Sequence, residues 1–352
     1  MSRRIRTGIG VLLSVLLLWW ALHDISFAEV LEQIREADPF LFSLAILVTV
    51  VGFWFRAVRW GVLLLPAAGP LPLRPRLAAT FIGFAANNLL PARVGEFARA
   101  FSLSRLTQVP TASAFATLVI ERILDGLIVV ALLFAAMATA GFPVADALGG
   151  VDLRTGALAI AGFIGLLGLG LGAAVAAPRP AARVAKGLTA LLPERLHEPI
   201  LVALRGFALG LAVLRDPKLF AISTVLALGQ WLFLATSFLL GFRAFGIDEV
   251  PFAGAVFMQS LISLAVAIPS SPGFFGPFEA AARLGLGLWN VPADQAISFA
   301  IGFHIGGFLP VTIIGVYYVW RLNLRWSDVR QSEERVEHGD PGIPTPPQPS
   351  RP

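Results

Sequence analysis

The sequence predicts an all-α, polytopic integral membrane protein with about six spanning helices and two re-entrant helical hairpins in an inverted repeat. Three observations support this prediction. The 352-residue chain is 57% apolar and 14% charged, whereas soluble domains carry about 25% charged residues. Long apolar segments recur along the chain, and short motifs of one half return in the other half.

Six segments are long and apolar enough to cross a bilayer, whose hydrocarbon core of about 30 Å requires roughly 20 helical residues. They are residues 8–22, 39–65, 111–139, 155–177, 218–242 and 294–320. The first ends in Trp19 and Trp20 and lacks a small-x-small cleavage site. We therefore interpret it as a retained helix, with a cleaved signal peptide as the alternative.

Basic residues predict the orientation, because cytoplasmic loops are enriched in Lys and Arg. The three Arg residues within 3–6 place the N-terminus in the cytoplasm. Stretch 23–38, with five acids and one Arg, lies outside. Stretch 178–218, with seven basic residues and three acids, lies inside and includes an amphipathic surface segment over 180–214. Basic residues within 321–325 return the C-terminus to the cytoplasm, so the predicted location is the cell membrane.

Two further apolar regions, 77–106 and 251–289, are interrupted midway by polar residues, Pro and Gly. In the orientation above, each begins and ends on one side of the membrane. Arms of about 13–18 residues would be about 20–27 Å long, which is mostly too short to span. Re-entrant hairpins are therefore predicted, although two complete crossings per region would satisfy the same orientation.

Two pairs of motifs indicate an internal repeat. "DPFLF" at 38–42 and "DPKLF" at 216–220 open the second and fifth spans, 178 positions apart. "NLLPARVGEF" at 88–97 and "PSSPGFFGPFE" at 269–279 follow with their Pro and Gly residues 181 positions apart. Three spans separate equivalent points, so the two halves have opposite orientation. In transporters of this architecture the site lies at the broken helices.

These features predict a single transmembrane domain over residues 1–325. Its inverted halves cover about 1–139 and 155–325. A disordered cytoplasmic tail follows over 326–352, because this segment is rich in Arg and Glu and then in Pro.

The break of the first region carries an unusual concentration of polar residues. Asn87 and Asn88 can satisfy freed backbone groups or cap the second arm, which we expect to begin near Ala92. Three charged residues spaced i, i+3 and i+6 share one side of this arm: Arg93, Glu96 and Arg99. A helix N-terminus beside an Arg guanidinium is a suitable anion site. Alternatively, Glu96 complements the helix dipole and pairs with an Arg.

The break of the second region has no Arg. Ser271 supplies a hydroxyl, Gly273 belongs to the break, and Glu279 lies just after Pro277, which suits the first turn of a helix. A plain helix–turn–helix with Glu279 as a dipole partner is the alternative.

The predicted span 111–139 contains "ERILD". Glu121 and Asp125 are i, i+4 neighbours, and Arg122 is i, i+3 to Asp125. Ionisable residues inside a spanning helix are functional candidates by default. A structural role is equally consistent, in which these residues form an ion pair that holds an Arg of the first hairpin.

Other polar residues in the spans have simpler explanations. Arg56 and Arg59 in "FRAVRW" either snorkel to lipid headgroups or join the charge network. Gln230 and His304 are expected to form hydrogen bonds between helices. The chain has no Cys and four scattered His, so we predict no disulfide, no thiol chemistry, no metal site and no cofactor. The net charge of +5 suits an anionic membrane surface better than a nucleic acid.

Four motifs, "FRAVRW", "NNLLPARVGEFARA", "ERILD" and "PSSPGFFGPFE", resemble in order and spacing the transmembrane domain of the lysylphosphatidylglycerol synthase/flippase family. The resemblance covers roughly residues 5–325. It implies a role in lipid translocation. The separate cytoplasmic acyltransferase domain of multidomain members is not seen in this sequence, so aminoacyl transfer is not expected.

We therefore expect a transporter or flippase-like protein, rather than an enzyme, that translocates or binds an anionic phospholipid or a lipid-linked headgroup. The residues expected to bind the substrate are Arg93, Arg99, Asn87, Asn88, Ser271 and Gly273. The residues expected to form the charge network are Glu96, Glu121, Arg122, Asp125, Glu279, Arg56 and Arg59. One alternative is a membrane-embedded transferase acting on a lipid or polyisoprenyl phosphate, and another is a helper subunit. A homodimer and a separate enzyme that supplies the lipid stay open as partners.

Overall fold

The computed structural model describes residues 3–90, 94–139, 142–143, 211–268 and 270–324, with four single positions at 162, 165, 166 and 169. This part of the chain contains helices and no strands. Its α-helices are α1 (Arg3–Leu22), α2 (Phe27–Glu36), α3 (Pro39–Ala68), α4 (Leu73–Leu89), α5 (Gly95–Leu106), α6 (Thr111–Met137), α10 (Pro217–Ala244), α11 (Phe252–Ala265), α12 (Pro277–Gly287) and α13 (Ala293–Arg321). Two short 3-10 helices, η3 (Leu211–Arg215) and η4 (Pro272–Phe274), precede α10 and α12.

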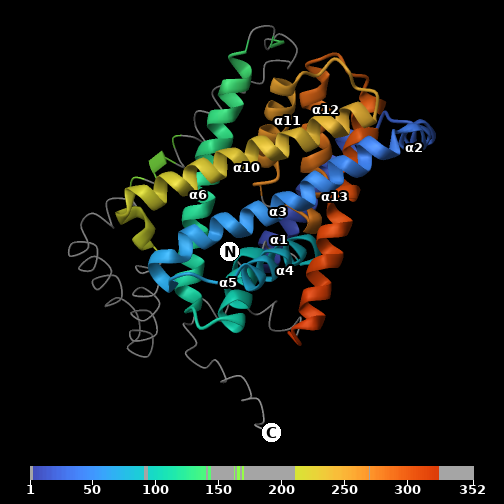
Figure 1. Ribbon diagram of the computed structural model, residues 1–352. Coiled ribbons are helices and arrows are strands. Elements are labelled where there is room, and N and C mark those ends of the chain that lie inside the picture. Colours follow the sequence, from blue (N-terminus) through green and yellow to red (C-terminus); the bar gives the residue numbers. More distant parts are fainter. Residues whose placement is uncertain are drawn as a thin grey trace.

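Helices α3 and α10 lie side by side along the middle of the molecule and run in opposite directions (Figure 1). Both begin with an Asp-Pro pair. The Asp38 carboxylate accepts hydrogen bonds from two backbone N–H groups at 2.8 and 3.0 Å, and Asp216 does the same at 3.0 and 3.1 Å. Such caps satisfy N–H groups that a helix start leaves unpaired. The start of α3 contacts the end of α10, where the Asp38 N–H donates to the Ala244 carbonyl at 2.8 Å.

The order and packing of helices in the first half recur in the second half. Helices α3, α4, α5 and α6 contain 30, 17, 12 and 27 residues, and α10, α11, α12 and α13 contain 28, 14, 11 and 29. Helix α4 packs on α13 as α11 packs on α6, and α5 packs on α6 as α12 packs on α13. The regions predicted to be interrupted are thus two pairs of short helices, α4–α5 and α11–α12.

Each pair of short helices depends on a glycine at the start of its second helix. A Cβ at Gly95 would collide with the Gly83 carbonyl and the Asn87 side chain of α4. Gly276 has a φ of 98°, and its Cβ would collide with the Ser14 carbonyl of α1. Only glycine allows both that backbone conformation and that approach.

The helix boundaries of α3, α6, α10 and α13 confirm the predicted segments 39–65, 111–139, 218–242 and 294–320 to within three residues. The second arm, predicted to begin near Ala92, begins three residues later, as α5 at Gly95. The predicted span 155–177, the surface segment 180–214 and the tail 326–352 lie outside the residues that the structure describes, apart from the four single positions and residues 211–214, which belong to η3.

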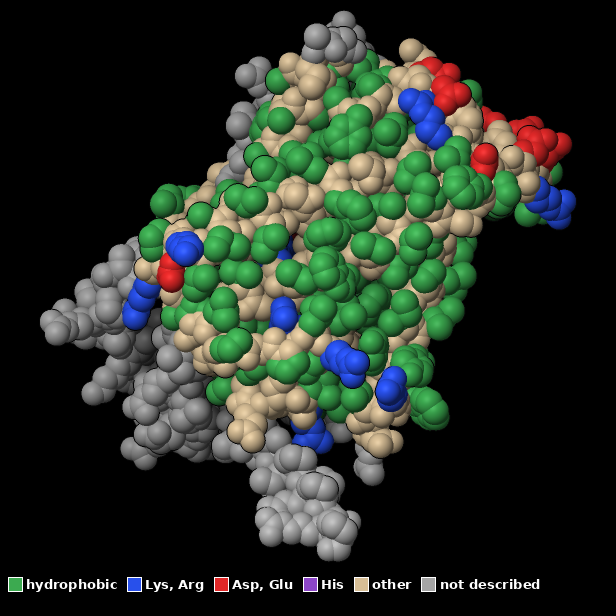
Figure 2. Space-filling model, viewed as in Figure 1, with side chains coloured by type: hydrophobic (Ala, Val, Ile, Leu, Met, Phe, Trp, Pro, Cys, Tyr) green, Lys and Arg blue, Asp and Glu red, His purple; other side chains and the backbone are tan. Residues whose placement is uncertain are grey.

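Three of the described helices, α3, α10 and α13, are long and apolar enough to cross a membrane, and a fourth crossing results if α1 and α2, bent by 81°, form one span. Helix α6 is 27 residues long and contains Glu121, Arg122 and Asp125. Large apolar side chains face outward on several helices, including Phe40 at 73% exposure and Trp320 at 75%. Figure 2 shows a broad apolar surface beside an end where most of the visible acidic side chains gather. The chain is therefore a multi-pass helical membrane protein.

Candidate functional site

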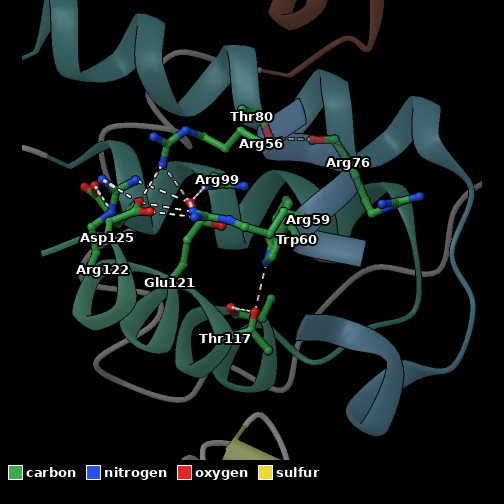
Figure 3. A network of polar contacts seen from close by, with 12 residues as sticks. Arg56, Arg59, Trp60, Arg76, Thr80, Arg99, Thr117, Glu121, Arg122 and Asp125 are labelled. Carbon is green, nitrogen blue, oxygen red and sulfur yellow. Dashed lines mark hydrogen bonds and ion pairs between the residues drawn. The ribbon is translucent and has the colours of Figure 1, made fainter. Parts of the chain in front are cut away.

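A cluster of buried charged side chains lies where α3, α5 and α6 meet (Figure 3). Helix α3 contributes Arg56 and Arg59, α5 contributes Arg99, and α6 contributes Glu121 and Asp125. These five side chains are no more than 8% exposed. The i, i+3 spacing on α3 and the i, i+4 spacing on α6 turn each pair toward the neighbouring helix.

Asp125 receives four hydrogen bonds in this arginine cluster. Arg59 donates to both of its oxygens, from Nη1 to Oδ1 at 2.6 Å and from Nη2 to Oδ2 at 3.1 Å. Arg56 Nη1 donates to Oδ2 at 3.0 Å, and Trp231 Nε1 of α10 donates to Oδ1 at 3.0 Å. The carboxylate therefore joins α3, α6 and α10.

Glu121 is bound through one oxygen. Its Oε1 accepts from Arg99 Nη1 at 2.7 Å and from Arg56 Nη1 at 3.0 Å. Arg99 also stacks on the Trp60 ring, with its guanidinium carbon 4.1 Å from the ring centroid. Among the described residues, Glu121 Oε2 and the Nε and Nη2 atoms of Arg99 have no hydrogen-bond partner.

Arg122 and Glu96 lie at the edge of the cluster, with side chains 40% and 28% exposed. Arg122 Nε lies 3.4 Å from Glu96 Oε1, and Arg122 Nη2 lies 3.5 Å from Glu121 Oε1. This pair connects α5 to α6 in a more exposed environment.

The buried part of the cluster holds three guanidinium groups, those of Arg56, Arg59 and Arg99, against two carboxylates. One positive charge is therefore in excess among these five side chains. Burying a charge without a partner is costly. An anion bound next to these groups would balance the charge, so the cluster is suited to receive one.

A cavity of about 280 Å³ lies beside the cluster, between α3, α4, α10, α11, α12 and α13. Most of its wall is apolar and aromatic, which is typical of ligand pockets. Arg56 lines the cavity and also binds both carboxylates of the cluster. The other hydrogen-bonding side chains of the wall are Thr49, Asn88, Trp231, Ser237, Gln259, Ser263 and His304.

The predicted residues of the first hairpin fall into different positions. Asn87 caps the second helix as expected, because its Oδ1 accepts from the Gly95 N–H at 2.8 Å. Asn88 lines the cavity, and its Nδ2 donates to Thr312 at 2.8 Å. Arg99 lies in the arginine cluster away from the cavity wall, and Arg93 lies outside the described residues.

The predicted residues of the second hairpin form a separate group. The Ser271 N–H donates to Ser14 Oγ at 2.7 Å, and neither Ser271 nor Gly273 lines the cavity. Glu279 contacts His304 of α13 rather than an Arg, with Oε1 2.7 Å from the ring Nδ1. Its Oε2 accepts from the Gly276 N–H at 2.6 Å, which is the role at the helix start that the sequence offered as the alternative to the charge network.

Trp231 has a role that the sequence did not indicate, because it binds Asp125. His304 forms the expected hydrogen bond between helices, and its partner is Glu279 of the second hairpin. Gln230, expected to bond between helices, is buried with both amide atoms unpartnered among the described residues. Arg56 and Arg59 join the charge network and do not snorkel, since they are 6% and 1% exposed.

The sequence matches known proteins over most of its length. The family described as "Lysylphosphatidylglycerol synthase TM region" matches residues 8–315. The chain is 29% identical over 305 residues to glycosyltransferase AglD of Haloferax volcanii, which covers 80% of this chain and 48% of that protein. It is 33% identical over 120 residues to a UPF0104 membrane protein of Pyrococcus horikoshii, which covers 33% of this chain and 35% of that protein. The chain thus spans half or less of these relatives, and no solved structure matches.

Proposed function

Because this chain belongs to the lysylphosphatidylglycerol synthase transmembrane-region family, we propose that it binds an anionic phospholipid or a lipid-linked anionic headgroup and moves it across the membrane. The observation that carries this proposal is the excess of buried positive charge next to a cavity, with Arg56 belonging to both. A phosphate in the cavity would meet a planar guanidinium fork, which binds phosphate through two parallel hydrogen bonds.

The proposal assigns different tasks to the members of the cluster. Arg56 contacts the phosphate, because it alone of the three buried Arg side chains lines the cavity. Arg99, with two nitrogens unpartnered in the described part, and Arg93 at the neighbouring break provide further positive charge. Glu121 and Asp125 hold the guanidinium groups in position while the anion is absent.

We further propose that the two halves are inverted repeats and that α4–α5 and α11–α12 are re-entrant hairpins, with both termini in the cytoplasm of the cell. The antiparallel packing of α3 on α10 and the recurring helix contacts support this arrangement. Short arms also support it, since 11 to 17 residues correspond to about 17–26 Å of helix, against about 30 Å of hydrocarbon.

A second candidate function is a transferase acting on a lipid or polyisoprenyl phosphate. The similarity to glycosyltransferase AglD favours this candidate. However, the name of AglD describes the whole of that protein, and this chain matches only 48% of it. Both candidates need the same anionic lipid at the arginine cluster, and they differ in whether the lipid is chemically changed.

The test uses purified protein in liposomes that contain labelled anionic or zwitterionic lipids. Wild-type protein should move an anionic lipid between leaflets. Arg56→Gln should lose about ten-fold or more of this rate, because a charged hydrogen bond contributes about 1.5–3 kcal/mol. It should still fold, since two Arg and two carboxylates would remain buried. Arg56→Lys should also be impaired because it lacks the fork, whereas Arg321→Gln, at an exposed side chain, should behave as wild type.

Three results would decide against parts of the proposal. Equal transport by folded Arg56→Gln would exclude the cluster as the anion site. Recovery of a covalently altered lipid when a sugar donor is supplied would favour the transferase. In the same liposomes, labelling of Arg74→Cys and Asp248→Cys from one side would contradict the orientation, which puts these positions on opposite sides of the membrane.

A further inference from the structure

Both ring nitrogens of His304 face hydrogen-bond acceptors. Nδ1 lies 2.7 Å from Glu279 Oε1, and Nε2 lies 2.8 Å from the Gly273 carbonyl oxygen. A neutral imidazole carries one N–H, and a carbonyl oxygen can only accept. The contact with Gly273 therefore takes the N–H of a neutral ring, and the contact with Glu279 requires a second proton.

This second proton belongs to the pair of side chains. It lies either on Nδ1, as imidazolium beside carboxylate, or on Glu279, as a carboxyl that donates to neutral Nδ1. The other carboxyl oxygen is already engaged, because Glu279 Oε2 accepts from the Gly276 N–H at 2.6 Å. In both arrangements the pair holds one proton more than a neutral His beside a carboxylate.

The pair lies beside the break of the second hairpin, and its His304 lines the cavity. Glu279 is 1% exposed and His304 is 8% exposed. The imidazole packs against two rings of the hairpin, with centroids 4.6 Å from Phe275 and 4.2 Å from Phe278. Both Phe278 and His304 line the cavity, so separation of the pair would change its wall.

The other charged groups on the surrounding helices have different partners or positions. Helices α1, α11 and α13 pack on α12, and α4 packs on η4. Helix α11 carries no ionisable residue, and Arg283 of α12 binds Asp24. The titratable residues that remain on these helices are Arg3, Arg4, Arg6, Arg74, Arg76, Asp294, Tyr317, Tyr318 and Arg321. Arg56 faces the same cavity from α3. Among the described residues, the one ion pair within 4.0 Å of Glu279 is the one with His304.

We propose that Glu279 and His304 form a proton-binding latch that keeps the second hairpin closed on the cavity and opens it when the proton leaves for water. Without that proton, the Nδ1 lone pair would face a carboxylate oxygen, and two acceptors at hydrogen-bond distance repel. Separation of the rings would then detach the Gly273 carbonyl from α13. The last step, admission of a lipid headgroup past the open hairpin, rests on the proposed function.

Two substitutions distinguish a latch from a structural hydrogen bond. In Glu279→Gln, the amide N–H can donate to neutral Nδ1 while the amide oxygen accepts from the Gly276 N–H. This variant should stay closed at every pH, because its contacts need no additional proton. His304→Phe keeps a ring against Phe275 and Phe278 but removes both hydrogen bonds, so it should stay open at every pH.

The reporter is a single cysteine at Ser270 in this otherwise cysteine-free chain. The Ser270 hydroxyl is buried and has no partner among the described residues, so Ser270→Cys disturbs little. The rate of labelling by a water-soluble thiol reagent is measured on the purified full chain between about pH 5 and pH 9, which includes the range in which an unperturbed imidazole changes charge. At each pH, the labelling rate of the Ser270→Cys protein is divided by the labelling rate of the Ser270→Cys, Glu279→Gln double variant. Because the thiolate is the reactive form in both proteins, this ratio removes the effect of pH on the thiol itself.

The expected ratio is near one at low pH and rises about ten-fold or more as the pH increases. A ratio that stays flat in otherwise wild-type protein would overturn the latch. His304→Phe should be labelled rapidly throughout; if it does not fold, the comparison with Glu279→Gln still decides. A rising ratio without movement of any lipid in liposomes would keep the latch and reject the proposed function. Lipid movement that is independent of pH and unchanged in Glu279→Gln would reject the latch alone.

Discussion

The two hairpins have helices of similar length, but different side chains join them to the neighbouring long helices. This contrast suits a first hairpin that stays in place and a second hairpin that moves in the proposed latch. In α4–α5, Arg99 binds Glu121 of α6 at 2.7 Å. In α11–α12, Glu279 binds His304 of α13 at 2.7 Å. Helix α5 packs on α6 as α12 packs on α13, so these contacts link equivalent helices. The backbone arrangement is shared, and the chemistry of the link is not.

On the proposed latch, this chemistry decides which hairpin responds to pH. Guanidinium groups keep their charge in proteins, so the contact of Arg99 with Glu121 does not depend on physiological pH. The contact of His304 with Glu279 needs a proton in addition to the ring N–H that faces Gly273, so on the proposed latch loss of that proton breaks it. We infer that the first hairpin holds the anion site in place and that the second controls access to it.

The second hairpin is also held at Arg283, further along α12 from the break. Arg283 of α12 donates to both carboxylate oxygens of Asp24 at 2.6 Å and to the Ala21 carbonyl at 2.8 Å. Its guanidinium also lies over the Trp20 ring, 5.2 Å from the centroid. These contacts fasten α12 to the end of α1, so a movement of the second hairpin would be concentrated at its break.

The largest expected effect comes from removing the carboxylate at the centre of the first anchor. Asp125→Asn would leave three buried Arg side chains with Glu121 alone. Breaking a buried pair in this way costs about 3–5 kcal/mol, so expression and melting temperature should fall together. Asp248→Asn is the matched control, since Asp248 pairs with Arg243 at an exposed position, with its own side chain 77% exposed, and should change stability little.

A double variant sharpens this prediction. Adding Arg56→Gln to Asp125→Asn restores the original excess of one charge, so part of the lost stability should return. A fully stable Asp125→Asn protein with unchanged transport would show that the cluster is no anchor. If Asp125→Asn is stable but its transport no longer depends on pH, Asp125 rather than the second hairpin is the group that couples transport to protons.

A smaller loss of stability is expected from substituting the glycines at which the second helix of each hairpin packs closely against its neighbour. Gly95→Ala should cost about 1–3 kcal/mol, because its Cβ would overpack α4. Gly276→Ala should cost about 2–4 kcal/mol, since its φ of 98° adds strain to a collision with Ser14. The control is Gly229→Ala on an open helix surface, which should stabilise α10 slightly. Thermal unfolding measures all three, and a Gly276→Ala protein as stable as Gly229→Ala would contradict the close approach of Gly276 to Ser14.

Sequence patterns predict the long helices well because their signals are local. The Asp-Pro pairs at 38–39 and 216–217 cap α3 and α10, and uninterrupted apolar runs define their lengths. Helix α5 begins at Gly95, three residues after the predicted start near Ala92. The predicted cap, Asn87, binds the Gly95 N–H from eight positions earlier, so its residue type indicates a cap but not the residue at which the helix begins.

The candidate site could be predicted only as a set of residue types. Arg59 and Asp125 are 66 positions apart, and their contact depends on how α3 packs against α6. The link between Glu279 and His304 depends in the same way on α12 and α13. Nothing local separates Arg56, which lines the cavity, from Arg59 one turn later, which does not. Partners across helices therefore require the tertiary structure.

The smallest expected effect concerns the contact between Arg283 and Asp24 in the loop before α2. Hydrogen bonding from Arg283 lowers the pKa of Asp24 to about 2. A carboxyl group with a lowered pKa stabilises the folded state fully above its unfolded pKa, near 4, and this stabilisation is lost as the pH falls through about 2. Asp24→Asn should therefore lower the melting temperature at neutral pH by only about 1–2 °C, and it should flatten the decline of wild-type stability between about pH 4 and pH 2. Thermal unfolding of both proteins across this range, with Asp248→Asn as the control, measures the difference. Identical acid sensitivity in the two proteins would show that this contact adds nothing, leaving Glu279 and His304 as the principal link of the second hairpin.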